Sequence, residues 1–317
     1  MLTWPHAYGD WGDVLPRAEA CFVQIATAIA ARQAVIISVF DAAHEAQVRQ
    51  QLAAANHANI HLYVNASNDV WARDHGPITV LRDGVPTLLD FTFNGWGGKY
   101  RADLDNTLTT RLHAQGAFGA RALQTVPVIL EGGAIEVNGA GALLTTARCV
   151  LSATRNPHLS REQTIALLCE QLGVHTVHML QHGGLEGDDT DGHIDTIVRF
   201  IDENTLVYQA CDEPRYSYYT ELKAMEAELQ ALPYRLIALP WPDAVYDADG
   251  RRLSAGYANF LIINGAVLLP VFGVAQDAQA VRVMQTAMPG YDILPIDCCA
   301  LIEQNGGLHC VTMQIPD

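Results

Sequence analysis

The sequence predicts an α/β fold built from five repeated modules. Segments rich in Ala, Leu, Glu and Gln, which favour helix, start 57 to 60 residues apart, near Ala42, Ala102, Ser160, Ser217 and Gln276. After each helix come a short β-branched run and then the pattern of a hairpin. Because each module exposes an apolar face that only a neighbour can cover, we expect the modules to close into a ring that forms one domain over residues 1–317.

The predicted single strands follow from β-branched composition. They are expected at residues 60–64, 176–180 and 291–296, each directly after a helix segment. An earlier strand, residues 34–39, precedes the first helix, and residues 312–315 form the one strand of the incomplete last module. We therefore expect strand 34–39 to supply the missing partner and close the ring.

Turn residues and one helix cap support these boundaries. Residues 78–81 and 87–91 flank a turn with Asp83-Gly84, and residues 194–201 and 205–209 flank an acidic turn, so both pairs are predicted as hairpins. Ser160 and Gln163 have the spacing of a capping box, which marks the start of the third helix.

Composition argues against several classes of protein. At 317 residues and 50% hydrophobic content, the chain can bury a large core. Its net charge of −16 argues against nucleic acid or anionic membranes as partners and would concentrate a small cationic substrate. Seven cysteines without a Cys-x-x-Cys pair, no signal peptide and no apolar stretch of membrane-spanning length predict a cytoplasmic protein.

Cys310 is the first candidate for chemistry. It closely follows Gly306-Gly307 and lies on an apolar stretch that we predict as a strand. Because glycines leave room for a ligand to approach the thiol, the position suits a nucleophile. For Cys310 taken alone, an inert buried cysteine is the alternative.

His193 and Asp195 form a second candidate pair. In a strand, side chains two residues apart point to the same face, so a base and a carboxylate would lie together. A metal-ligand pair and a solvated acidic loop are the alternatives. The sequence has no second histidine pair with ligand spacing, and we therefore predict no metal site.

Asp74 and Glu131 occupy loops that contain glycine. Asp74 stands just before Gly76-Pro77, a break that would hold its carboxylate rigidly; a surface turn of Arg73 and Asp74 is the alternative. Glu131 is followed by a pair of glycines, which is a weak signal by itself.

These candidates recur in phase with the repeat. Asp74, Glu131, His193 and Cys310 lie 29 to 34 residues after the helix starts of their modules. In a closed ring, equivalent positions face one centre, where we expect these side chains to converge together with Asp195. Such a group suits a planar guanidinium, because paired carboxylates accept its forked N–H donors and a thiolate can add to its central carbon.

At these residues the chain resembles the agmatine deiminase family, one of the guanidine-modifying enzymes, which include arginine and peptidylarginine deiminases. The similar segments extend over nearly the whole chain: residues 4–6, 68–80, 93–100, 131–146, 187–200, 259–273 and 306–316. The fold of that family, a five-bladed pseudo-symmetric α/β propeller called a pentein, agrees with the five modules counted above.

The resemblance implies a role for each candidate. It implies a nucleophilic thiolate at Cys310, a general acid and base at His193, guanidinium-binding carboxylates at Asp74 and Asp195, and an orienting carboxylate at Glu131. The implied reaction is hydrolysis of agmatine to N-carbamoylputrescine and ammonia through a covalent thiouronium intermediate, in putrescine synthesis and without a cofactor. The family commonly forms homodimers, which is the implied assembly.

Five further residues are candidates for binding the rest of the substrate. Trp71 and Trp96 suit contact with the guanidinium or the alkyl chain, with simple packing as the alternative. Asp188 and Asp191 suit a distal ammonium, which would favour agmatine over an arginine that bears a carboxylate. Asn259 occupies a similar place in the fourth module and is expected either to line the site or to cap the backbone.

Three other functions remain open from the sequence. A peptidylarginine deiminase and an amidinotransferase would use the same core residues. A catalytically inactive propeller would bind cationic ligands or proteins without releasing ammonia.

Overall fold

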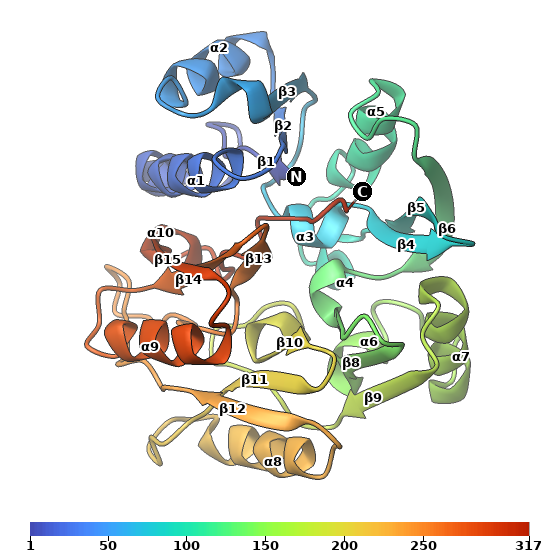
Figure 1. The fold of residues 1–317 in the computed structure, drawn as a ribbon, viewed down its shortest axis with the longest axis vertical. Coiled ribbons are helices and arrows are strands. Elements are labelled where there is room, and N and C mark those ends of the chain that lie inside the picture. Colours follow the sequence, from blue (N-terminus) through green and yellow to red (C-terminus); the bar gives the residue numbers. More distant parts are fainter. Residues whose placement is uncertain (317) are drawn as a thin grey trace. The chain divides into compact units, whose positions relative to one another are not determined.

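The computed structural model describes residues 1–316 and contains five three-stranded sheets, which confirms the predicted α/β modules (Figure 1). In three sheets, two antiparallel strands are followed by a helix and by a third strand parallel to the second. Parallel neighbours need a long crossover connection, and the helix supplies it. The repeat is therefore hairpin, helix, strand, which is the predicted cycle entered at a different point.

These three modules contain one main helix each. Their elements are β4 (Ile78–Arg82), β5 (Val85–Thr92), α5 (Leu108–Ala114) and β6 (Ala122–Ile129); β7 (Ile135–Val137), β8 (Ala142–Thr146), α7 (Arg161–Leu172) and β9 (Thr176–Leu180); and β10 (Val198–Asp202), β11 (Thr205–Gln209), α8 (Tyr219–Gln230) and β12 (Arg235–Leu239).

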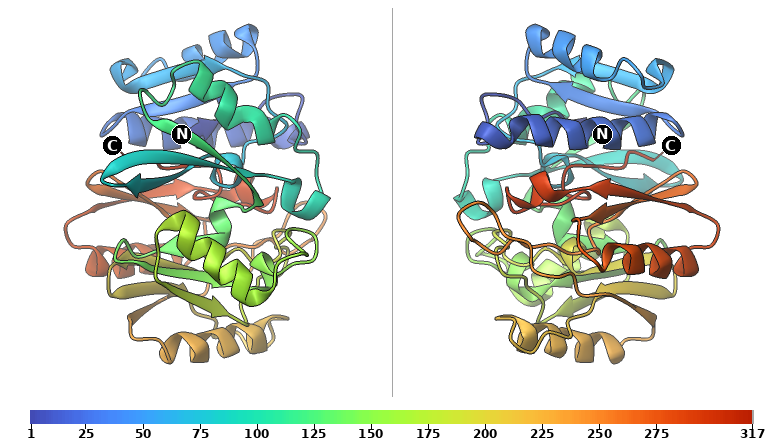
Figure 2. Two further views of the ribbon diagram at one scale, coloured as in Figure 1. Left: turned by 90° about the vertical axis from the view of Figure 1, so that its right-hand side faces the viewer. Right: turned by 90° about the vertical axis from the view of Figure 1, so that its left-hand side faces the viewer.

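The remaining two sheets begin and end the chain. Their elements are β1 (Leu2–Thr3), α1 (Leu15–Ala30), β2 (Val35–Val39), α2 (Ala42–Gln51) and β3 (Ile60–Val64); and β13 (Leu261–Ile263), β14 (Ala266–Val271), α9 (Asp277–Ala287) and β15 (Asp292–Asp297). The sheet β1-β2-β3 lies between α1 and α2 (Figure 2), and β2 is almost entirely buried because both of its faces are covered.

Short helices occupy the connections between these elements. They are the α-helical turns α3 (Ala72–His75), α4 (Gly95–Gly98), α6 (Ala147–Val150) and α10 (Cys299–Ile302), and the 3-10 turns η1 (Gly12–Val14), η2 (His57–Asn59), η3 (Asp105–Thr107), η4 (Gly132–Ala134) and η5 (Ile194–Thr196).

The first predicted hairpin is confirmed and the second begins later than predicted. Asp83 and Gly84 join β4 to β5 with φ of 51° and 78°, the left-handed backbone that suits a two-residue hairpin turn. In the second hairpin, β10 starts at Val198 rather than at residue 194. Residues 194–196 form η5 instead, where the Ile197 N–H bonds the Ile194 carbonyl.

Two helix starts match their predictions closely because local side chains cap them. The Ser160 hydroxyl and the Gln163 side chain form the predicted capping box of α7. Asp41 caps α2 by accepting the His44 N–H. The start predicted near Ala102 is wrong by six residues, since α5 begins at Leu108 and the preceding stretch forms η3.

The chain ends differ from the prediction. Residues 312–315 form no strand; Thr312 makes only an isolated bridge to Leu2. Strand β2 pairs with β1 instead. The two strands are parallel, and Leu2 lies opposite Ile37. The long helix α1 also lies outside the predicted repeat of five helices.

The described residues divide into two compact units, each with its own core. The first unit holds residues 1–132, 261–268 and 308–316, and its core includes Ala72, Leu88, Leu108 and Met313. The second unit holds residues 133–260 and 269–307, and its core includes Ile194, Ile197, Leu206 and Met225. A single domain over residues 1–317 stays a prediction.

Within residues 1–316, the structure contains no helix of the length and apolar character that crossing a membrane requires.

Candidate active site

The ten predicted site residues are shared between the two units. The first unit contains Trp71, Asp74, Trp96, Glu131 and Cys310, and the second contains Asp188, Asp191, His193, Asp195 and Asn259.

Cys310 is buried and lies in a turn, so the prediction that it lies on a strand is wrong. Cys310 is only 4% exposed. The turn is closed by the Thr312 N–H, which donates to the His309 carbonyl at 3.0 Å. The Cys310 carbonyl accepts the Arg73 N–H at 3.0 Å, and this bond places the backbone of Cys310 beside the segment that carries Asp74.

Asp74 belongs to the one-turn helix α3. Arg73 and Asp74 are only 8% and 5% exposed, so the alternative of a surface turn is wrong. The helix ends before Gly76, a position that requires glycine because a β-carbon there would lie 2.4 Å from the Ala72 carbonyl oxygen and 3.2 Å from Met313. The Arg73 side chain extends to Met313 Sδ and Gln314, which ties α3 to the end of the chain.

Both predicted tryptophans lie beside Asp74 and are almost completely buried. The Trp96 Nε1–H donates to Asp74 Oδ2 at 2.9 Å. The Trp71 Nε1–H donates to Asp69 Oδ2 at 2.8 Å, and the two indole rings meet edge to face at 6.5 Å. Aromatic rings therefore line the surroundings of the Asp74 carboxylate.

Asp69 and Asp105 support this segment, and the sequence did not single them out. Asp105 accepts the backbone N–H groups of Asn68 at 2.7 Å and of Asp69 at 3.2 Å. Burial raises the pKa of Asp69 to about 6 and that of Asp105 to about 7. The only sequence signal was the run of polar residues at 68–69, because Asp105 lies on a distant segment.

Glu131 is completely buried just before η4. The next residue must be glycine, since a β-carbon at Gly132 would lie 2.2 Å from the Arg73 carbonyl oxygen. The segment that carries Glu131 therefore packs directly against α3.

In the second unit, His193 and Asp195 are completely buried at the start of η5, not on a strand. Strand geometry therefore does not place these two side chains on one face. The loop is held by the His193 N–H, which donates to Thr190 Oγ1 at 3.0 Å, and by Thr196 Oγ1–H, which donates to the His193 carbonyl at 2.8 Å.

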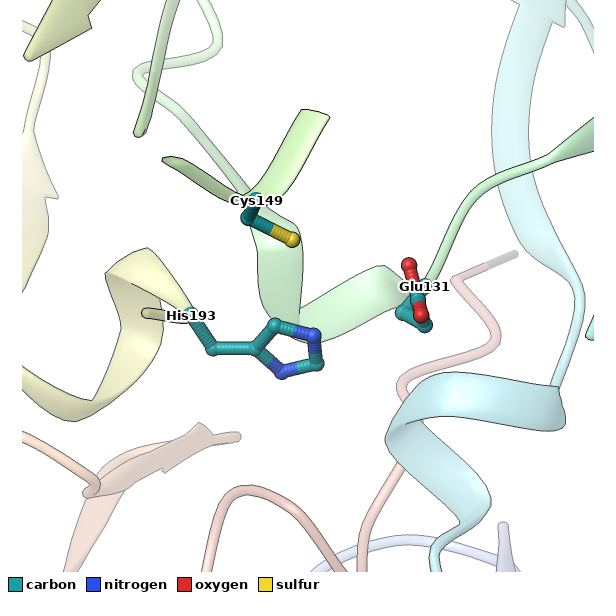
Figure 3. Close-up of side chains that lie close together, drawn as sticks. All are labelled: Glu131, Cys149 and His193. Carbon is teal, nitrogen blue, oxygen red and sulfur yellow. The ribbon is translucent and has the colours of Figure 1, made fainter. Parts of the chain in front are cut away.

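Cys149 lies next to His193 and was missed by the sequence analysis. Its Sγ is within 4.8 Å of a ring nitrogen of His193, and Figure 3 shows the two side chains beside each other. The Thr146 hydroxyl donates to the Gly192 carbonyl at 2.6 Å, which connects the start of α6 to the loop before His193. No local motif marks Cys149, because its neighbour is 44 residues away in the sequence.

Asp191 and Asp188 both stabilise that loop. The buried Arg155 donates to Asp191 Oδ2 at 2.6 Å and to the Thr190 carbonyl at 2.8 Å. Asp188 accepts the Thr190 N–H at 3.0 Å and the Gly192 N–H at 2.6 Å. The loop therefore uses both carboxylates, and their role toward a distal ammonium stays a prediction.

A narrow pocket in the second unit contains Asn259 and Asp188 in its lining. It also includes Asn305, Gly306, Gly307 and Phe272. The Asn259 Nδ2–H donates to the Asp195 carbonyl at 3.2 Å, and a β-carbon at Gly307 would lie 2.4 Å from Asn259 Oδ1. Gly307 is thus required by close contact with Asn259, and it lies three residues before Cys310 in the chain.

Comparison with known proteins identifies the family. Residues 1–316 match the family described as Porphyromonas-type peptidyl-arginine deiminase. The agmatine deiminase of Stutzerimonas stutzeri is 33% identical, with 99% of this chain and 92% of the relative covered.

Two solved structures have the same fold. A Porphyromonas gingivalis protein provisionally named an arginine deiminase is 47% identical, with a TM-score of 0.93 over 99% of this chain and 94% of that one. A variant of the C. jejuni agmatine deiminase with substrate bound is 33% identical, with a TM-score of 0.93 over 98% and 91%. The chain is therefore a member of the agmatine deiminase and Porphyromonas-type peptidyl-arginine deiminase family, a family of guanidino-group deiminases with the pentein fold.

Proposed function

We propose that this protein hydrolyses agmatine to N-carbamoylputrescine and ammonia, with Cys310 as the nucleophile. The observation that carries the proposal is the bond between the Arg73 N–H and the Cys310 carbonyl, which joins a buried thiol to the segment of Asp74. A thiol and a carboxylate on adjoining segments suit attack on a guanidinium carbon.

The proposed reaction has two halves. Asp74 and Asp195 bind the guanidinium, and the Cys310 thiolate forms a bond to its central carbon. The C–N bond to one terminal nitrogen then breaks, and His193 protonates that nitrogen so that ammonia leaves and a thiouronium remains. Water, deprotonated by His193, adds to the same carbon. The C–S bond then breaks and the new hydroxyl group loses its proton to solvent, so that the products are the ureido compound and the thiolate. Glu131 is proposed to orient His193.

We propose that the pocket that contains Asn259 receives the tail of the substrate. Among its described lining residues, Asp188 is the one carboxylate, and none is Lys or Arg. The carboxylate of a free arginine substrate would need a positively charged residue in the pocket as its partner. The amine of agmatine is instead attracted to negative charge. This contrast supports agmatine as the substrate.

Arginine and peptidyl arginine form the second candidate substrate class. The observation that favours them is the 47% identity to the P. gingivalis protein, which exceeds the 33% identity to the agmatine deiminases above. Because both substrate classes share the guanidinium, the same experiment distinguishes them.

The test is release of ammonia and ureido product from agmatine, arginine and a blocked arginyl peptide. We expect turnover of agmatine, loss of turnover in Cys310→Ala, and a covalent adduct on Cys310 after acid quenching, detected by mass spectrometry. Cys299→Ala is the matched control and should retain activity, since Cys299 is a partly exposed thiol on α10. Turnover in Cys310→Ala would exclude the nucleophile, and preference for the peptide would reassign the substrate.

A further inference from the structure

Helix α4 is a left-handed turn. Its four residues, Gly95–Gly98, all have positive φ, with values of 68°, 54°, 87° and 81°. The Gly98 N–H bonds the Asn94 carbonyl at 2.9 Å and the Lys99 N–H bonds the Gly95 carbonyl at 3.0 Å, which is helical spacing. The turn connects β5 to the segment before α5 (Figure 1).

Trp96 is an unusual residue for this backbone. Among residues 1–316, the non-glycine residues with positive φ are Asp83, Trp96, Asp191 and Asn305. Asp and Asn tolerate this conformation, whereas a bulky side chain at φ of 54° and ψ of 49° is disfavoured. Strained residues of this kind persist where the surroundings hold them, and they concentrate at functional sites.

The surroundings hold Trp96 from several sides. Asn94 Oδ1 accepts the Gly97 N–H at 2.8 Å. A β-carbon at Gly95 would lie 2.3 Å from the Tyr100 carbonyl oxygen, so that position requires glycine. The indole ring meets Phe93 edge to face at 5.0 Å and Tyr100 at 5.6 Å. The ring is therefore fixed in one orientation.

That orientation directs the indole N–H at Asp74. Trp96 Nε1 lies 2.9 Å from Asp74 Oδ2, and both residues are buried. A carboxylate turns easily about its terminal torsion, so a fixed donor removes freedom that would otherwise be lost when substrate binds. An indole N–H donates without net charge, and it therefore does not compete with a guanidinium as Lys or Arg would.

We propose that Trp96 is a positioning residue: the left-handed turn Gly95–Gly98 holds its indole N–H against Asp74 and sets the plane in which that carboxylate receives a guanidinium. The inference rests on the proposed role of Asp74. It differs from direct stacking of Trp96 on the substrate, because it assigns the effect to the N–H group and not to the aromatic ring.

The first test compares Trp96→Phe with Trp96→Leu. Both remove the N–H, and only Phe keeps an aromatic ring. We expect both to lower kcat/KM for agmatine by about tenfold to a hundredfold, the usual effect of losing a hydrogen bond to a charged group. The matched control is Trp241→Phe, which removes an indole N–H bond to Glu213 at 3.1 Å in the second unit and should leave kcat/KM within twofold.

The second test changes the turn and leaves Trp96 intact. Gly98→Ala and Gly84→Ala both place a β-carbon in open space at nearly equal φ, 81° and 78°. The two should lower stability equally in urea unfolding. Only Gly98→Ala should reduce kcat/KM, because only that residue shares the turn with Trp96.

Calorimetry in the Cys310→Ala background separates this inference from the proposed function. Agmatine should bind this background, and Trp96→Phe should weaken the binding about tenfold or more. Suppose that the wild type turns over agmatine and that Trp96→Phe has the same kcat/KM, whether or not Trp96→Leu is impaired. Positioning by the indole N–H is then excluded, while the proposed function stands. If the wild type neither binds nor deiminates agmatine, arginine or the peptide, the proposed function fails, and the inference fails with it.

Discussion

At the residue scale, the half-buried Asp69 and the buried Asp105 hold the segment that leads to Asp74. Asp69 accepts the Val70 N–H and the Trp71 indole N–H, both at 2.8 Å, and Asp105 accepts the N–H groups of Asn68 and Asp69. Burial raises both pKa values, because the interior penalises the charged form more than these bonds favour it. We therefore expect the stability of this segment to depend on pH.

Asp105→Asn is predicted to change how stability depends on pH. Unfolded Asp105 ionises near pH 3.8 and folded Asp105 near 7, so between these values the folded state keeps a proton that the unfolded state has lost. The stability from this group is complete below pH 3.8 and is lost as pH rises through 7. The free energy of unfolding of wild type minus that of Asp105→Asn should thus fall from pH 5 to 7, by up to about 1.4 kcal/mol per pH unit, and then level off.

Urea unfolding at a series of pH values measures this difference. The comparison with a variant is needed because buried His6 and His75, whose pKa values fall to about 4 and about 3, contribute with the opposite sign in both proteins. Asp103→Asn is the control, since an exposed carboxylate paired with Arg101 has a lowered pKa and should give a flat difference. A flat difference for Asp105→Asn as well would mean that its carboxyl is ionised throughout.

At the scale of elements, a buried ion pair joins three segments of the second unit. Arg199 on β10 donates to Glu136 on β7 at 2.7 Å and to the Phe260 carbonyl before β13 at 2.6 Å. Glu136 also accepts the Phe200 N–H at 3.1 Å, and the guanidinium lies 4.8 Å from the centre of the Phe260 ring. Arg199 thus connects β10 and β7, the first strands of two sheets, to Phe260, the residue just before β13.

Arg199→Met is predicted to lower the free energy of unfolding by about 3–5 kcal/mol, because it leaves the buried Glu136 without this charge partner. The double variant Glu136→Met/Arg199→Met should recover much of the loss, since no buried charge then remains at the pair. Urea unfolding of both single variants and the double variant gives the coupling. A double variant as unstable as the sum of the singles would rule out strong coupling between the two charges.

At the scale of the whole molecule, the net charge of −16 acts on any charged substrate. Agmatine carries two positive charges at neutral pH. We expect its KM to rise severalfold when NaCl increases from about 0.05 M to about 0.5 M, because salt screens long-range attraction while kcat depends on short contacts. An alkylguanidine without the distal amine should respond less, and an equal response would show that the field does not act on the second charge.

Much of the fold was determined by short-range signals in the sequence. The capping box at Ser160 and the turn at Asp83-Gly84 depend on residues within a few positions of each other, and the structure confirms both. The helices recur near the predicted period, except that α5 starts six residues later than predicted. Backbone hydrogen bonding and side-chain entropy act locally, so a sequence reports them directly. The same period placed the candidate site residues in phase within their modules.

Tertiary structure decided the environment of those residues. The Trp96 indole bonds Asp74 from 22 residues away, and Arg73 bonds the carbonyl of Cys310 near the other end of the chain. His193 directly precedes a 3-10 turn where a strand was expected. Each depends on a partner that only folding brings close, and a buried polar group takes whatever conformation satisfies that partner. The sequence by itself therefore determined the modules and the residue types of the site, while packing decided which atoms of those residues meet.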